Sequence, residues 1–199
     1  MEAVKPYGDI PFPLPEWGSF PSLFYADLKW PAEKLDAIVA LGESGKQEGV
    51  ALTGSGGKMP TRRSTISWLK ANDPQAAQLF IDLANEVLPV NAEHWQFDLW
   101  GYRDPLQYTV YHAGDEFGWH TDTGAGLHSR KLTVSLQLSD PSEYEGCDLQ
   151  LRVGEEIQEA PRERGTISIF PSFVLHRVTP LTKGVRRALI GWIAGPQFR

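Results

Sequence analysis

The sequence predicts a mainly β fold, a double-sheet barrel or jelly roll with N-terminal helices packed on one outer face. Three observations support this fold class. Apolar residues recur at helical spacing before about residue 95, they alternate with polar residues after it, and turn residues separate the alternating runs. The 199 residues suffice for one domain with a buried core. We expect residues 1–95 to form an arm and supporting helices, and residues 96–195 to form the β core.

The first thirty residues are rich in proline and aromatic side chains, which predicts an extended arm laid over the core. Pro31 is typical of a first helical turn, so we expect a helix from there to about Leu41, closed by Gly42. The Gly-Ser-Gly-Gly-Lys run at 54–58 predicts a flexible loop.

A second helix is predicted behind Asp73 and Pro74, which form a cap and a first-turn proline. Pro89 is expected to end it. Apolar residues recur at helical spacing between these points and predict a face buried against the sheet: Ala77, Phe80, Leu83, Ala84, Val87 and Leu88.

The second half of the chain has the period of two that strands show. The expected strands are 132–138, 149–153, 165–170 and the apolar closing run 188–194. Turn signals at 140–142 and 161–163 separate them.

Composition limits the function classes. The formal charge of −6, with no cluster of Lys and Arg, argues against a nucleic-acid partner. A single cysteine, Cys147, forms no intrachain disulfide and suits a reducing compartment. The first residues lack a signal-peptide pattern, and no apolar run approaches a membrane span of about 20 residues. We therefore expect a soluble, cytoplasmic protein with no membrane partner and leave its oligomeric state open.

Three side chains predict a metal site. His120 and Asp122 are two residues apart in a strand-like run, so both point to one face, and His176 follows downstream. Two histidines and one carboxylate on one side of a metal are typical of non-haem Fe(II) oxygenases. Singly, the three have ordinary interpretations as a polar strand residue, a turn residue and a core histidine. Together they favour metal binding and catalysis at this site.

Arg186 indicates what binds beside the metal. A guanidinium inside an apolar strand is costly unless a carboxylate pairs with it, and its planar fork suits a carboxylate. A dicarboxylate could bind the metal with a 2-oxo acid end and Arg186 with its far end. Tyr111 is a candidate second contact, with a core tyrosine as the alternative. Arg187 is the alternative candidate for this contact, but the alternation of side chains along a strand places it on the opposite face.

The run 107–122, QYTVYHAGDEFGWHTD, resembles the core of the Fe(II)/2-oxoglutarate-dependent dioxygenases, and more closely their prolyl/lysyl-hydroxylase-like bacterial branch. Further matching segments lie at 130–133, 144–149, 170–172, 176–178 and 184–186. The resemblance implies a double-stranded β-helix over 96–195, iron held by His120, Asp122 and His176, and 2-oxoglutarate held by Arg186.

Two positions depart from the family pattern. Cys147 stands where a second glycine is usual, which could alter a strand bend. Ala188 stands where a hydroxyl residue often helps to hold the cosubstrate, which leaves that role to Arg186 and Tyr111.

The activity implied by the resemblance is hydroxylation of an unactivated C–H bond in a prolyl or amino-acid-like residue or a small molecule. This reaction consumes O2 and releases succinate and CO2, and ascorbate is a candidate stimulant of the reaction. Asp122 disfavours halogenation because a carboxylate ligand leaves no vacancy for halide. The alternatives are a catalytically silent barrel that senses 2-oxoglutarate or metal, and a zinc hydrolase, which Arg186 argues against.

Substrate contacts are less clear from the sequence. Candidates are Tyr102 and Arg103, with Arg63, Trp68 and the loop at 54–57 as a lid. For four tryptophans the alternative is core packing: Trp68, Trp95, Trp100 and Trp192.

Overall fold

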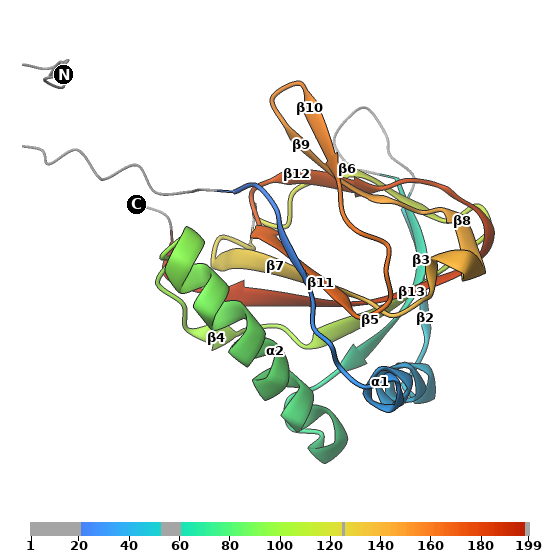
Figure 1. Cartoon of the computed structure of the whole chain (residues 1–199), viewed down its shortest axis with the longest axis horizontal. Helices are drawn as coiled ribbons and strands as arrows, with labels where there is room; N and C mark the ends of the chain where they lie inside the picture. Colours follow the sequence, from blue (N-terminus) through green and yellow to red (C-terminus); the bar gives the residue numbers. More distant parts are fainter. Residues whose placement is uncertain (1–20, 53–60, 125, 198–199) are drawn as a thin grey trace, which may run out of the picture.

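The computed structural model describes residues 21–52, 61–124 and 126–197, and in these ranges it forms one curled antiparallel sheet with two α-helices (Figure 1). The elements in chain order are β1 (Phe24–Asp27), α1 (Ala32–Ser44), β2 (Glu48–Leu52), β3 (Arg62–Leu69), α2 (Pro74–His94), β4 (Gly101–Tyr102), β5 (Leu106–His112), β6 (Glu116–His120), β7 (Arg130–Gln137), β8 (Tyr144–Gly146), β9 (Leu149–Val153), β10 (Glu156–Glu159), β11 (Thr166–Pro171), β12 (Leu175–Val178) and β13 (Leu181–Ala194). The predicted mainly β class with helices is confirmed.

The sheet curls into two facing layers (Figure 1). One layer has the order β11-β7-β13-β5, and the other has the order β6-β12-β9-β10. Strand β3 joins them, because it pairs antiparallel with β5 along Thr65–Leu69 and with β6 at Arg62 and Arg63. The result is the double-stranded β-helix that the resemblance implied.

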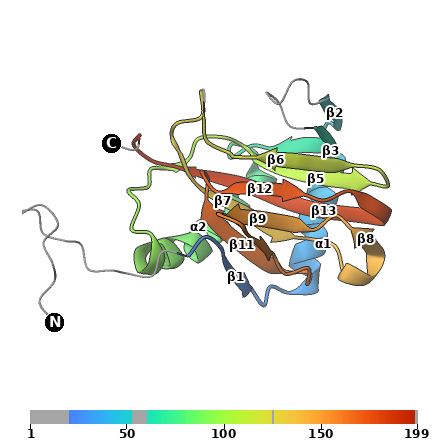
Figure 2. The ribbon, with the colours of Figure 1, turned by 90° about the horizontal axis from the view of Figure 1, so that it is seen from above.

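Both helices cover the outer face of the layer that contains β7, β13 and β5 (Figures 1 and 2). Strand β7 is buried on both of its faces. Leu132, Val134 and Leu136 belong to the core that includes the helices. The alternate residues Thr133 and Ser135 line a cavity between the two layers.

Helix α1 ends later than predicted. It runs to Ser44 and is capped by Gly45, so Gly42 lies inside it and the predicted end at Gly42 was wrong. The reason for a glycine is close packing against β5. A Cβ atom at Gly42 would lie 2.3 Å from Cγ of Tyr108, which no real side chain tolerates.

Helix α2 begins as predicted, because the Asp73 side chain accepts a hydrogen bond from Gln75 N at 2.9 Å. The predicted end at Pro89 was wrong, since the helix continues to His94. Pro89 and Asn85 are exposed, so the Asn85 carbonyl that loses its helical donor can bind water. The buried face is Ala76, Leu79, Phe80, Leu83, Val87 and Asn91, and the predicted Leu88 is 52% exposed.

Three strands precede residue 95, where only an arm and helices were expected. Strand β1 pairs with β11, so the arm joins the sheet from Phe24 onward. The first twenty residues and the predicted loop at 54–58 lie outside the described residues. Neither helix in the described ranges is long and apolar enough to cross a membrane.

Candidate metal centre

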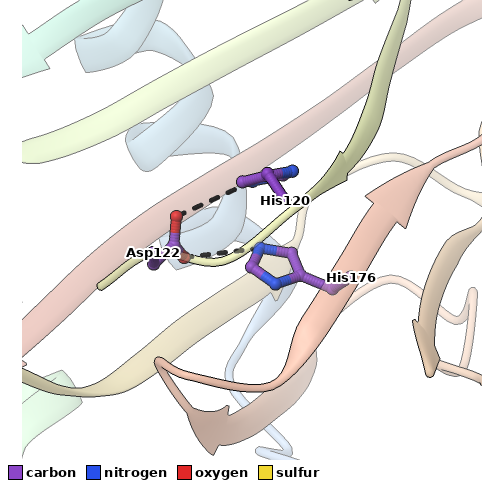
Figure 3. A group of neighbouring side chains, drawn as sticks. All are labelled: His120, Asp122 and His176. Atoms are coloured by element: carbon purple, nitrogen blue, oxygen red, sulfur yellow. Dashed lines mark ion pairs between the residues drawn. The ribbon is translucent and has the colours of Figure 1, made fainter. Parts of the chain in front are cut away.

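His120, Asp122 and His176 come together between the two layers (Figure 3). His120 is the last residue of β6, and antiparallel pairing with β12 places His176 directly opposite it. Each of the three residues offers one ligand atom, and these atoms lie within 4.8 Å of one another. Asp122 was expected on the strand but lies two residues past its end, where its N–H donates to Ser172 O at 2.9 Å. That hydrogen bond holds the turn that aims the carboxylate.

The backbone orients both imidazole rings. Nδ1 of His120 lies 2.8 Å from Gly118 O, and Nδ1 of His176 lies 2.9 Å from Val174 O. A carbonyl oxygen only accepts, so each Nδ1 carries a proton, and Nε2 is the ring nitrogen that faces Asp122. The Nε2 atoms lie 3.7 Å and 3.4 Å from the two carboxylate oxygens of Asp122. Ligand bonds of about 2.1 Å to one metal ion would hold donor atoms roughly 3 to 3.5 Å apart.

Aromatic packing fixes the rings further. Phe117 stacks on His120 with ring centroids 3.5 Å apart, and Phe170 meets His176 edge-on at 4.8 Å. Burial and the nearby His176 together lower the pKa of His120 to about 4. His120 is therefore neutral at pH 7, the form that can bind a metal.

Asp122 is ionised although it is buried. Burial alone would raise its pKa, but His176, His120 and the indole N–H of Trp192 outweigh burial and hold the pKa well below its usual range. Thr133 Oγ1 donates to Asp122 Oδ2 at 2.8 Å and lies 3.1 Å from Ser172 Oγ. Two imidazoles and one carboxylate on one face form a donor set that fits a divalent iron ion.

The three residues line a cavity of about 380 Å³ that also contains Arg186. Arg186 is 5% exposed, and its Nε donates to Gln137 Oε1 at 3.1 Å. Tyr111 is its register partner on β5, with the Arg186 Cζ 5.8 Å from the ring. Burial raises the pKa of Tyr111 to about 12, so its hydroxyl remains a donor. Arg187 faces away from the cavity and pairs with Glu43 at 2.9 Å, as alternation predicted.

Both departures from the family pattern have a structural counterpart. Ala188 pairs with Gln137 on β7, and the Gln137 amide makes the polar contact to Arg186 from the strand beside Ala188. Gly146 and Cys147 have φ angles of 74° and 59°, so the chain keeps a left-handed bend although the second residue is not glycine. The Cys147 side chain is fully buried, and burial raises its pKa to about 11, so it is a protonated thiol and a poor nucleophile.

Aromatic and cationic side chains form another part of the cavity wall. Trp68 and Trp192 both line the cavity, with ring centroids 6.4 Å apart. Core packing was the wrong interpretation for Trp68, which is 38% exposed, whereas Trp192 is buried as that interpretation held. Arg130 lies over the Trp192 ring at 3.9 Å and pairs with Asp104 at 2.9 Å. These groups form a flat, partly charged wall.

Other candidate substrate contacts do not line the cavity. Tyr102 packs edge-on against Phe80 on the helix side of the sheet, and Arg103 donates to Ser129 Oγ at 3.0 Å. Arg63 is exposed and donates to Gly114 O, while Trp100 is 73% exposed and so is not a core residue. Trp95 is a core residue, as the alternative interpretation held.

Sequence reasoning missed three groups of the site: Arg62 and Thr133, which line the cavity, and Gln137, which accepts a hydrogen bond from Arg186. The available signal for two of them was the polar half of the alternating run 132–138, since a polar strand face can line a cavity as well as face water. Arg62 lies in a strand that had not been predicted.

Comparisons with known proteins agree with this geometry. Residues 106–194 match the family model described as the 2OG-Fe(II) oxygenase superfamily. The chain is 41% identical to a PKHD-type hydroxylase of Synechococcus sp. strain CC9902 over 82 residues, which cover 41% of this chain and 37% of that protein. It is 31% identical to a PKHD-type hydroxylase of Shewanella baltica over 147 residues, which cover 69% of this chain and 63% of that protein. The chain thus spans less than two thirds of the length of these curated relatives.

Solved structures share the fold. A prolyl-4-hydroxylase of Pseudomonas putida superposes with a TM-score of 0.67 at 17% identity, covering 88% of this chain and 93% of that one. A Trichoplax adhaerens prolyl hydroxylase, solved with a peptide of hypoxia inducible factor, superposes with a TM-score of 0.68 at 16% identity, covering 87% and 83%. These likenesses confirm the double-stranded β-helix.

Proposed function

We propose that the chain, whose residues 106–194 match the model of the 2OG-Fe(II) oxygenase superfamily, is a non-haem Fe(II)- and 2-oxoglutarate-dependent dioxygenase that hydroxylates an unactivated C–H bond. The main support is one observation: two histidines and an ionised aspartate share a single cavity with a buried arginine. Iron and 2-oxoglutarate, when bound with O2, supply the oxidising chemistry that turns C–H into C–OH while the cosubstrate becomes succinate and CO2.

His120, Asp122 and His176 hold the metal from one side in this proposal. Their Nδ1–H donors are used by backbone carbonyls, so the rings present Nε2 without a competing tautomer. Thr133 keeps Asp122 Oδ2 in place with a short hydrogen bond. All three residues line the cavity, so a metal ion held by them would be open to cosubstrate and O2 from the cavity side.

Arg186 receives the distal carboxylate of 2-oxoglutarate. The Gln137 amide occupies Arg186 Nε and fixes the plane of the guanidinium, which leaves its terminal N–H groups for a carboxylate. Tyr111 adds a hydroxyl donor beside it. Apolar cavity residues exclude water around the aliphatic part: Leu149, Phe170 and Val178.

The substrate lies against the wall formed by Trp68, Trp192 and Arg130. Flat indole faces suit a compact apolar ring or chain, and Arg130 is held rigid by Asp104 and the Trp192 ring. This surface supports a prolyl or amino-acid-like residue, or a small molecule of similar size, as the substrate class.

The test is turnover of carboxyl-labelled 2-oxoglutarate by protein loaded anaerobically with Fe(II) and then exposed to O2, with and without ascorbate. We expect release of labelled CO2 with equimolar succinate, stimulated by peptidyl-proline or amino-acid substrates. Asp122→Ala should abolish turnover and retain the circular dichroism spectrum of the folded protein. Cosubstrate binding without turnover across a broad substrate panel would favour the sensing barrel instead.

A further inference from the structure

Building on the proposed function, we propose that Arg62 is a second cationic contact for 2-oxoglutarate. It binds the carboxylate next to the keto group at the metal end of the cavity, while Arg186 binds the distal carboxylate. Three features of Arg62 carry this inference: an unused donor, an uncompensated charge and a place beside the metal ligands.

The unused donor is Arg62 Nη2. It is buried and has no hydrogen-bond partner, although Arg62 lines the cavity. The side chain makes one long hydrogen bond, from Nε to Ser64 Oγ at 3.3 Å. A buried donor without an acceptor costs free energy, so the folded chain keeps this N–H available for a group that arrives later.

The charge of Arg62 is also unpaired. Burial lowers its pKa, but a guanidinium remains protonated at neutral pH. Across the described parts of the chain, no carboxylate forms an ion pair with Arg62 or Arg186, whereas the third cavity arginine, Arg130, pairs with Asp104. Among the described residues that line the cavity, Asp122 is the one carboxylate. Two unpaired guanidiniums in one cavity match the two carboxylates of a dicarboxylic acid.

The position of Arg62 separates it from Arg186. Arg62 is opposite Phe117 in the β3–β6 pairing, and its Cζ lies 4.6 Å from the Phe117 ring. Phe117 stacks on the metal-side residue His120 at 3.5 Å. Arg186 lies instead beside Tyr111 and Gln137. The charge of Arg62 also acts on Asp122 and His120, in agreement with its place at the metal end.

Two ligands distinguish the two arginines. 2-Oxoglutarate has both carboxylates, and 2-oxopentanoate has the same carbon chain with a methyl group in place of the distal carboxylate. Both keep the keto acid that faces Arg62 in this proposal, whereas 2-oxoglutarate alone has a group for Arg186. Binding of each ligand is measured by calorimetry on protein loaded with Mn(II), which avoids turnover.

Arg62→Gln should raise the Kd of both ligands by about tenfold or more, since each loses one charged hydrogen bond. Arg186→Gln should weaken 2-oxoglutarate by a similar factor and leave 2-oxopentanoate unchanged. The matched control is Arg63→Gln, because Arg63 is the exposed neighbour that faces away from the cavity and should leave both Kd values unchanged. Without ligand, Arg62→Gln should melt no lower than the wild type, since it removes an unsatisfied buried charge.

The remaining outcomes count against the inference. A loss confined to 2-oxoglutarate would place Arg62 at the distal carboxylate, and unchanged binding of both ligands would assign its charge to the substrate. Wild-type protein that fails to bind 2-oxoglutarate with Mn(II) would refute the proposed function itself. Should Arg62→Gln not fold, Arg62→Lys answers the same question, because an ammonium keeps the positive charge but loses the planar, two-pronged donor geometry of a guanidinium. Equal weakening of the binding of both ligands supports the proposal. Unequal or absent weakening overturns it.

Discussion

Replacing Thr133 with valine tests whether the buried hydroxyl organises the metal ligands. The substitution keeps the shape of the side chain and removes the hydrogen bond to Asp122 Oδ2, which is 2.8 Å long and fully buried. A hydrogen bond to a buried charged group contributes about 1.5–3 kcal/mol, and about 1.4 kcal/mol corresponds to a tenfold change in Kd. We therefore expect Thr133→Val to weaken Mn(II) or Fe(II) binding by about 10- to 100-fold, the range seen for residues that orient metal ligands.

The metal-free protein should also lose stability. Ser172 Oγ, which is 3.1 Å from Thr133 Oγ1 and fully buried, loses a partner, at a cost of about 1–3 kcal/mol. Metal affinity is measured by competition with a metal-binding dye, and stability by urea unfolding. The matched control is Thr109→Val, since Thr109 is equally buried and accepts from Gln107 without contacting a candidate metal ligand. Metal affinity within twofold of the wild type would refute the role given to Thr133.

Two further predictions concern the fold. Gly42→Ala should lower the free energy of unfolding by several kcal/mol, because the new methyl group collides with the Tyr108 ring. In the control variant Gly49→Ala the methyl group meets no atom within 4 Å, so the free energy of unfolding should change little. Equal urea midpoints for the two variants would contradict the packing argument. The pKa of His120 falls from 6.5 to about 4 on folding, so the unfolded chain binds more protons between these values, and the metal-free protein should lose stability as the pH falls from 6.5 towards 4. The loss of stability should approach about 1.4 kcal/mol per pH unit within that window, as measured by urea unfolding at each pH. It should be smaller in His120→Asn. If both proteins lost stability with the same pH slope, the effect would belong to other groups.

The sequence predicted the fold class and the residues that meet at the candidate metal centre, because both depend on strong local patterns. Alternation identified the strands on each side of His120 and His176, and the spacing of His120 and Asp122 suggested a shared face. The aspartate nevertheless lies beyond the strand end, where a hydrogen bond to Ser172 positions it. That contact joins residues fifty positions apart, so no local pattern could reveal it.

What the sequence could not predict depends on distant partners. Gly42 looked like a helix end, but its role is set by the Tyr108 ring on a later strand. Pro89 looked like a stop, but its exposed position makes the missing hydrogen bond tolerable. Strand β3 was missed because its short alternating run carries polar residues on the face that turns out to line a cavity.

Strand β3 lies outside residues 106–194, the part matched by the superfamily model, yet it supplies Arg62, Ile66 and Trp68 to the cavity. The candidate metal ligands and the cavity residues on β3 are therefore encoded in separate stretches of the gene. Exchanging residues 62–69 for those of a relative would change the shape and charge of the chamber and keep its metal ligands. Ligand preference in such chimeras could diverge while the oxidising centre is inherited unchanged.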